Sequence, residues 1–188
     1  MPCLAIHLAV AKKYYEKHRD LNYQEFIDGT LAPDLGNDNI DNYINILNDD
    51  KTGRHFSINS KTNNVIEYIK RKVDFKLFFQ HNDINSSFLK GYFLHLLCDH
   101  YYFKDYVMSE DLKKLSLEEA IKICYNDYDI ITPILIDKYH LEIPKLAESF
   151  LTRKGSGNLV LLNEDNVYKF IDDMSNLDLI EEKIKKTS

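Results

Sequence analysis

Glycine and proline are scarce in this sequence, and long apolar runs are missing. The chain has 6 Gly and 4 Pro among 188 residues. Because these two residues supply most tight turns, their scarcity favours long helices over a sheet of many short strands. A membrane-spanning helix needs about 20 mostly apolar residues, and no such stretch occurs. We therefore expect no transmembrane segment.

Strongly basic runs and paired cysteines are missing as well. The net charge is −6 and no strongly basic run occurs. Because affinity for nucleic acid comes largely from Lys and Arg that neutralise phosphates, we expect no duplex nucleic acid as a partner, and only a local basic pocket stays open. Cys3, Cys98 and Cys124 are widely spaced without a CxxC pattern, which is typical of reduced thiols in an intracellular protein. The N-terminal "MPCLAIHLAV" has no preceding basic region and contains His7, unlike a signal peptide. These features predict a cytoplasmic protein.

Apolar residues recur at helical spacing along most of the chain. This spacing predicts helices over roughly 3–18, 62–79 and 84–104, and a short helix near 40–47. Another short helix around 23–27 is expected to stop at Gly29, with "LAPDLGNDN" as a loop that Pro33 begins to break. Ser86 and Ser87 are expected to cap the 84–104 helix.

The second half of the chain also reads as helical. Ser116 and Glu119 form a capping box, and an apolar helical set follows up to Ile131. Pro133 is expected to start or kink the next segment, and Pro144 to open a short helix. "RKGSGN" predicts a loop, and Val167 to Leu177 a final helix. The predicted fold is all-α: one domain, 1–188, built as a multi-helix bundle around a buried His/Asp metal site.

The stretch "FLKGYFLHLLCDHYYF", residues 88–103, is apolar except for a few ionisable groups at its centre. Buried charges are costly unless they are paired or bind a metal. His95 and Asp99 are four residues apart, so on a helix they share one face. Imidazole and carboxylate are both zinc ligands. The alternative is a hydrogen-bonded His–Asp pair with a purely structural role.

Three further residues have plain interpretations when each is taken alone. His7 lies in an apolar helix, as a core histidine would. Asp34 follows Ala-Pro, as a turn aspartate or a helix cap would. His55 lies in an irregular polar stretch, as a surface histidine would. Together with the HxxxD pair they make a set of three His and two Asp that suits a hydrolytic zinc site. His18 and His81 have polar neighbours and are expected to be solvated.

Four segments resemble, in order, the motifs of the bacterial zinc-dependent phospholipase C family, and most closely its small intracellular members. The segments are "AIHLAVAKKY", "FIDGTLAPDL", "RHF" and "GYFLHLLCDHYYF", which fall within about the first 105 residues. The resemblance implies an all-α bundle around a metal cluster.

The resemblance also implies a role for each residue of the set. His55, His95 and Asp99 would hold one Zn²⁺, Asp34 would join them and bridge to a second ion, and His7 would bind that second ion. Secreted members use an N-terminal Trp as a further ligand, and this chain has no Trp. A third metal would need two more His and a Glu, whereas only His100 and His140 follow His95. His100 is expected to hydrogen-bond behind the ligands.

The predicted function is a zinc-dependent phosphoester hydrolase, a phospholipase C-like phosphodiesterase with one or two Zn²⁺ ions. Another divalent transition metal would serve the same ligands. The substrate would be a phospholipid headgroup or a small soluble phosphoester, and Asp34 would orient the attacking water or accept its proton. The sequence carries no indication of oligomeric state.

Two alternatives stay open at this point. An HD-type nucleotide phosphohydrolase is also all-α with a His/Asp metal site, but it needs an adjacent His-Asp, and this chain has the reverse order, Asp99-His100. The other alternative is a non-catalytic helical metal-binding protein. A closed site of four protein ligands is structural, whereas a site with an open position is catalytic.

Overall fold

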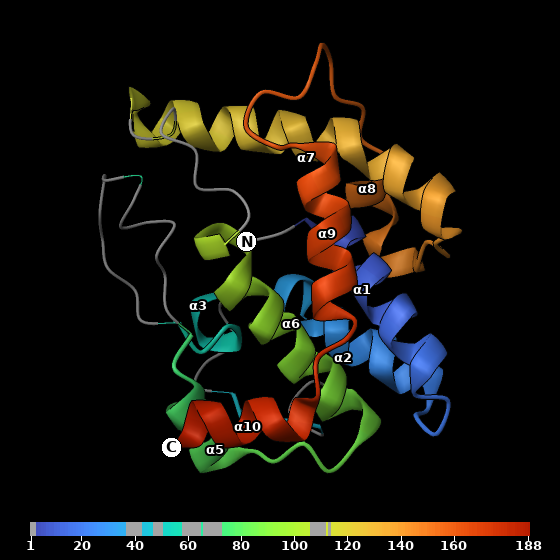
Figure 1. Ribbon diagram of the computed structural model, residues 1–188, viewed down its shortest axis with the longest axis vertical. Coiled ribbons are helices and arrows are strands. Elements are labelled where there is room, and N and C mark those ends of the chain that lie inside the picture. The colour runs from blue at the N-terminus through green and yellow to red at the C-terminus, as the bar shows by residue number, and fades with distance from the viewer. Residues whose placement is uncertain are drawn as a thin grey trace.

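The computed structural model describes residues 3–36, 43–46, 51–57, 65, 73–105, 112 and 114–188. These residues form an all-α bundle, as predicted, and the only β interaction among them is an isolated antiparallel bridge between Ser57 and Val73. Helix α7 lies across one end of the molecule, and α5 and α10 lie together at the other end (Figure 1). In chain order the elements are α1 Leu4–Lys17, α2 Tyr23–Leu35, α3 Lys51–Arg54, α5 Phe75–His81, α6 Ser87–Asp105, α7 Leu117–Tyr139, the 3₁₀ helix η3 Lys145–Ala147, α8 Glu148–Leu151, α9 Glu164–Met174 and α10 Leu179–Thr187. Across the described ranges, no helix is long and apolar enough to span a membrane.

Several helix ends follow the sequence predictions. The Ser86 hydroxyl accepts a 3.1 Å hydrogen bond from the Leu89 N–H at the start of α6. Ser116 and Glu119 form the expected capping box on α7. Pro144 directly precedes η3, as expected, and η3 leads directly into α8. Side-chain caps satisfy backbone groups that a helix end would otherwise leave unpaired, so these signals act locally and can be predicted from sequence.

The predicted stop at Gly29 and break at Pro33 were wrong, and Pro133 does not start a new segment; a kink at Pro133 stays a prediction. Helix α2 continues through Gly29 and Pro33 to Leu35, and α7 continues through Pro133 to Tyr139. A proline inside a helix costs about 3 kcal/mol, because it removes one backbone hydrogen bond and crowds the preceding turn. Burying one large apolar side chain returns about 1.5–3 kcal/mol. Both helices bury several such residues around the proline, so tertiary packing outweighs the local preference.

The 62–79 and 40–47 predictions also need correction where the structure describes the chain. Val73 lies in the bridge to Ser57, and the Asp74 carboxylate caps a separate helix, α5, by accepting the Leu77 N–H at 2.9 Å. Residues 62–64 and 66–72 lie outside the described residues. Residues 43–46 are not helical, and the rest of the 40–47 prediction also lies outside. The sequence reading missed α3, and it missed α10, which follows the helix predicted to be last.

Helices α2 and α6 form the most extensive helix pair, and two glycines allow their backbones to touch. A Cβ atom on Gly29 would lie 2.0 Å from the Phe88 carbonyl oxygen, and one on Gly91 would lie 2.1 Å from the Phe26 carbonyl oxygen. Real Cβ atoms do not approach backbone so closely, so both positions require glycine. This contact sets the depth at which α6 packs on α2.

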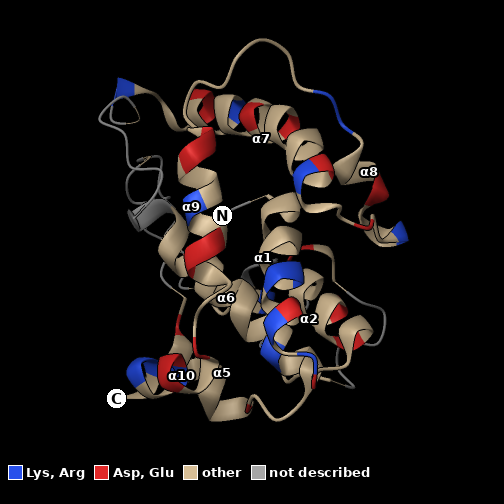
Figure 2. Cartoon of the chain, turned by 45° about the vertical axis from the view of Figure 1, so that its right-hand side comes forward, with Lys and Arg blue, Asp and Glu red and all other residues tan. Residues whose placement is uncertain are grey.

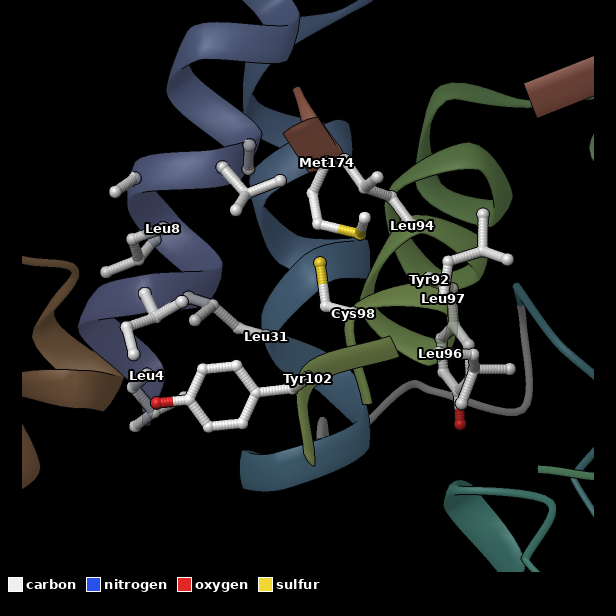
Figure 3. Close-up of a cluster of buried hydrophobic side chains, with 14 of the residues drawn as sticks. Leu4, Leu8, Leu31, Tyr92, Leu94, Leu96, Leu97, Cys98, Tyr102 and Met174 are labelled. Atoms are coloured by element: carbon white, nitrogen blue, oxygen red, sulfur yellow. The ribbon is translucent and has the colours of Figure 1, made fainter. Parts of the chain in front are cut away.

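The core beside this contact is apolar. Figure 3 shows side chains from α1, α2 and α6 packed together, with the sulfur atoms of Cys98 and Met174 pointing toward one another. Cys98 is 1% exposed, and burial raises the pKa of its thiol well above the ordinary value. The cysteine is therefore neutral and acts as a small core residue.

Charged residues are frequent on the described helices, and most are exposed or half-buried, although Asp127 on α7 and Glu182 on α10 are buried. Figure 2 marks their positions along the cartoon: α7 is mainly acidic, and on α10 the acidic residues precede the basic ones. This distribution suits a solvated surface.

Candidate metal centre

Five residues from four separate segments meet in the interior. His7 comes from α1, Asp34 from the last turn of α2, His55 from the residue after α3, and His95 and Asp99 from α6. Their ligand atoms form two groups, His7/His95/Asp99 and Asp34/His55/His95, and within each group the atoms lie within 4.8 Å of one another. All five residues singled out in the sequence are therefore brought together.

The three histidines of this cluster are buried in the protein interior. His7 is 1% exposed, His55 3% and His95 0%. The His7 and His95 rings stack with their centroids 3.7 Å apart and their planes 6° apart. The surface position that the sequence suggested for an isolated His55 is therefore wrong. Polar side chains this deeply buried need partners.

The orientation of His95 is fixed by the helix pair described above. Its Nδ1 atom lies 2.7 Å from the backbone carbonyl oxygen of Thr30 on α2. A carbonyl can only accept a hydrogen bond, so Nδ1 carries the proton and donates it. The lone pair of neutral His95 is then on Nε2, which faces His55 and Asp99. Metal-binding histidines in proteins are commonly held in this way.

Asp99 faces both halves of the cluster. Its Oδ1 atom lies 3.5 Å from Nε2 of His7, and its Oδ2 atom lies 3.5 Å from Nε2 of both His55 and His95. Asp34 belongs to the second half, with Oδ1 3.4 Å from Nε2 of His55. The geometry therefore favours Asp99, rather than Asp34, as the carboxylate that bridges two ions.

The separations within the cluster suit metal ligands better than direct hydrogen bonds. Nε2 of His55 lies 3.4 Å from Nε2 of His95 and 3.4–3.5 Å from the two carboxylates. Hydrogen bonds of this kind are about 2.7–3.2 Å long. Four ligands about 2.0–2.1 Å from a tetrahedral zinc ion would be about 3.3–3.4 Å apart.

His7 offers a second reason to consider a metal. Neither of its ring nitrogens has a hydrogen-bond partner among the described residues, although the side chain is buried. An unsatisfied buried polar atom costs about 1–3 kcal/mol, so its persistence calls for an explanation. A metal ion between Nε2 of His7 and Oδ1 of Asp99 would give each of these two atoms a partner.

The electrostatics prepare these groups for a cation. Burial alone would raise the pKa of the Asp34 and Asp99 carboxyls, but the neighbouring histidines outweigh burial and hold both pKa values well below the ordinary range. Burial and the adjacent His95 lower the pKa of His7 to about 4. Burial also acts to lower the pKa of His95, but the Asp99 and Asp34 carboxylates outweigh it and raise that pKa. Two ionised carboxylates and a neutral His7 at pH 7 match what metal binding requires, whereas the raised pKa of His95 opposes it, because a ligand histidine must be neutral.

The remaining histidines lie apart from both groups. The His100 ring contacts the edges of the Phe75 and Tyr101 rings, with centroids 5.3 and 4.9 Å away. The expected hydrogen bond behind the ligands stays a prediction. His140 is exposed at the C-cap of α7. His81 is exposed as expected, whereas His18 is half-buried and stacks on Tyr14 at 4.1 Å, so it is not the solvated residue predicted.

Sequence reasoning missed the residues that hold the ligands in place. Thr30 acts through its backbone, so its side chain gives no indication of that role. Tyr92 and Phe56 stand inside the segments "GYF" and "RHF", beside the ligands, but an aromatic residue there reads as ordinary core.

Comparisons with protein-family models, with curated proteins and with solved structures found no match.

Proposed function

We propose that this protein is a metal-dependent phosphoester hydrolase, with zinc as the preferred ion. His55, His95, Asp99 and Asp34 would hold one ion, and His7 with Asp99 would contribute to a second. The observation that carries the proposal is the set of 3.4–3.5 Å separations around Nε2 of His55, which match the edges of a zinc coordination shell.

The resemblance to zinc-dependent phospholipase C supports the same proposal. Its motifs assign a ligand role to these five residues, which lie up to 92 positions apart in the chain, from His7 to Asp99. That all five lie in one buried cluster is what this assignment requires. The lack of Trp still argues that any second ion has fewer protein ligands than in the secreted enzymes.

A bound zinc ion supplies Lewis acidity, which lowers the pKa of water toward neutrality and offsets negative charge on phosphoryl oxygens. The chain's own residues then do the rest. Asp34 has the most exposed side chain of the five, at 10%. Its pKa lies below the ordinary range, so it is ionised at pH 7 and can orient a water molecule or accept a proton from it.

The HD-type alternative has less support. It needs neighbouring His and Asp ligands, and here the neighbour of Asp99 is His100, whose ring packs on Phe75 and Tyr101. A non-catalytic metal-binding protein is favoured by the deep burial of the three histidines. The cytoplasmic location expected from the sequence stays a prediction.

A substrate screen with metal-loaded protein tests the proposal. We expect chelator-sensitive hydrolysis of a nitrophenyl phosphodiester or a phosphocholine ester. Phosphatidylcholine vesicles and soluble phosphoesters should be assayed side by side, since they separate the two substrate classes. Fully metal-loaded protein that hydrolyses no phosphomonoester, phosphodiester, phospholipid or single-stranded nucleic acid would contradict the enzymatic proposal and favour the non-catalytic one.

A further inference from the structure

The turn that carries His55, residues 53–57, contains a strained backbone. Phe56 has φ = 47°, in the left-handed region. This region is uncommon for residues other than Gly, Asn and Asp, and a bulky side chain is strained there. Such a conformation persists only when the surrounding contacts hold it. The strained residue directly follows a candidate metal ligand.

The Phe56 side chain and backbone are both anchored. The ring is fully buried and meets the edge of Phe78 at 5.2 Å and of Tyr92 at 6.4 Å. The Phe56 N–H donates to the Gly53 carbonyl at 3.1 Å, and the Phe56 carbonyl accepts from the Asp74 N–H at 2.7 Å. These contacts hold the backbone on both sides of Phe56, the residue that follows His55.

Two further hydrogen bonds tie the residue before His55 to the helices that carry the other ligands. The Tyr92 hydroxyl on α6 donates to the Arg54 backbone carbonyl. Tyr92 precedes His95 by three residues, so this hydrogen bond, the tether between the turn and α6, starts about one helical turn from His95. The Arg54 Nε atom donates to the Pro33 carbonyl at 3.2 Å, directly beside Asp34.

We infer that Tyr92 and Phe56 are positioning residues for His55. The buried Phe56 ring keeps the turn in its left-handed conformation. The hydrogen bond from the Tyr92 hydroxyl holds that turn against α6, about one helical turn from His95. The turn itself is short and irregular, and a ligand on such a segment needs outside support to hold its geometry. The functional consequence rests on the metal site proposed above.

This role differs from simple core packing, which Tyr92 also provides. Packing depends on the ring, whereas the tether depends only on the hydroxyl. Tyr92→Phe keeps the ring and removes the hydroxyl. Tyr102→Phe is a matched control, since Tyr102 is equally buried on the same helix and packs against Phe170 at 4.9 Å. Figure 3 shows the Tyr102 side chain reaching toward Leu4, on the opposite side of α6 from Tyr92.

The experiment compares the two variants with the wild type by two measurements. The first is amide hydrogen exchange of Phe56 and Asp74 in metal-free protein. We expect about tenfold faster exchange in Tyr92→Phe, the effect of losing one hydrogen bond, and no change in Tyr102→Phe. The second is zinc affinity in a competition assay with a chelating dye. We expect Tyr92→Phe to weaken binding by about 10- to 100-fold, and Tyr102→Phe to leave it within about threefold.

The two measurements separate the positioning role from the proposed function. Equal exchange rates in the two variants would overturn the positioning role. So would faster exchange with zinc affinity unchanged, because the turn would then open without disturbing His55. Wild-type protein that binds no zinc would contradict the metal site and, with it, a positioning role directed at metal binding. The exchange rates of Phe56 and Asp74 would then report only on the stability of the turn at residues 53–57.

Discussion

The Nδ1 atom of His95 donates a 2.7 Å hydrogen bond to the backbone carbonyl of Thr30, which ties a candidate ligand to the packing of two helices. The glycine contacts between α2 and α6 determine whether that carbonyl is in reach. Ligand orientation is thus a property of helix packing. The chemistry proposed for the site depends on backbone contacts that no side-chain motif records.

The first prediction concerns His95, which belongs to both ligand groups. His95→Ala should weaken zinc binding by more than about 100-fold, because it removes a ligand that the other groups cannot replace. His81→Ala is the control, since His81 is exposed. Metal content by elemental analysis and melting temperature should be measured on both variants. Equal losses would mean that the histidines were assigned wrongly.

The second prediction separates the two aspartates. Asp99 faces His7 on one side and His55 and His95 on the other. Asp99→Asn should therefore lower the metal stoichiometry of the whole cluster. Asp34→Asn should keep at least one ion and lose most turnover, because we propose that Asp34 orients the attacking water or accepts its proton. Metal content and rate should be measured on the same preparations. The reverse order of metal loss would contradict the assignment of Asp99 as the bridging ligand.

The third prediction concerns the α2–α6 contact. Gly29→Ala should lower the free energy of unfolding by about 3 kcal/mol or more, because its Cβ would overlap the Phe88 carbonyl and force the helices apart. Gly157→Ala is the matched control: it has φ = 79° but no atom within 4 Å of its Cβ, so it should cost only about 1 kcal/mol. Urea denaturation gives both values. A Gly29→Ala protein as stable as the control would show that the helices do not touch as described.

The fourth prediction is the pH dependence of the metal-free protein. The folded-state pKa of His7 is about 4, below its ordinary 6.5. Between these values the unfolded chain binds more protons, so the free energy of unfolding should fall as the pH falls, by up to about 3 kcal/mol. The raised pKa of His95 acts in the opposite sense and at higher pH, because its stabilising contribution is lost as the pH rises through that pKa.

His7→Phe tests this prediction, because phenylalanine fills a similar space and binds no proton. The difference in stability between wild type and variant should shrink or reverse as the pH is lowered from 6.5 to 4. Chemical denaturation at several pH values in the presence of a chelator measures it. Parallel curves for the two proteins would show that His7 is not held in its neutral form by folding.

The helical class and the His95–Asp99 pair could be predicted from the sequence because both depend on local signals, whereas His7, Asp34 and His55 were assigned through the order of motifs in the family resemblance. Helical spacing and the Ser116 capping box lie within a few residues of each other, and the HxxxD pair shares one turn. The errors arose where contacts between residues distant in the sequence determine the structure. Gly29 and Pro33 read as a stop and a break, but packing against α6 carries the helix past both. The burial of His55 depends on hydrogen bonds that Tyr92 and Asp74 make to its two neighbours, Arg54 and Phe56. No local sequence pattern connects these distant residues.

The most direct test of the account is the metal content of untagged protein purified from metal-replete medium, with calorimetric rebinding after chelation. The account predicts one to two equivalents of a transition metal, chiefly zinc, that a chelator removes and added zinc restores. Protein that contains no stoichiometric metal and gives no binding heat with zinc would contradict it.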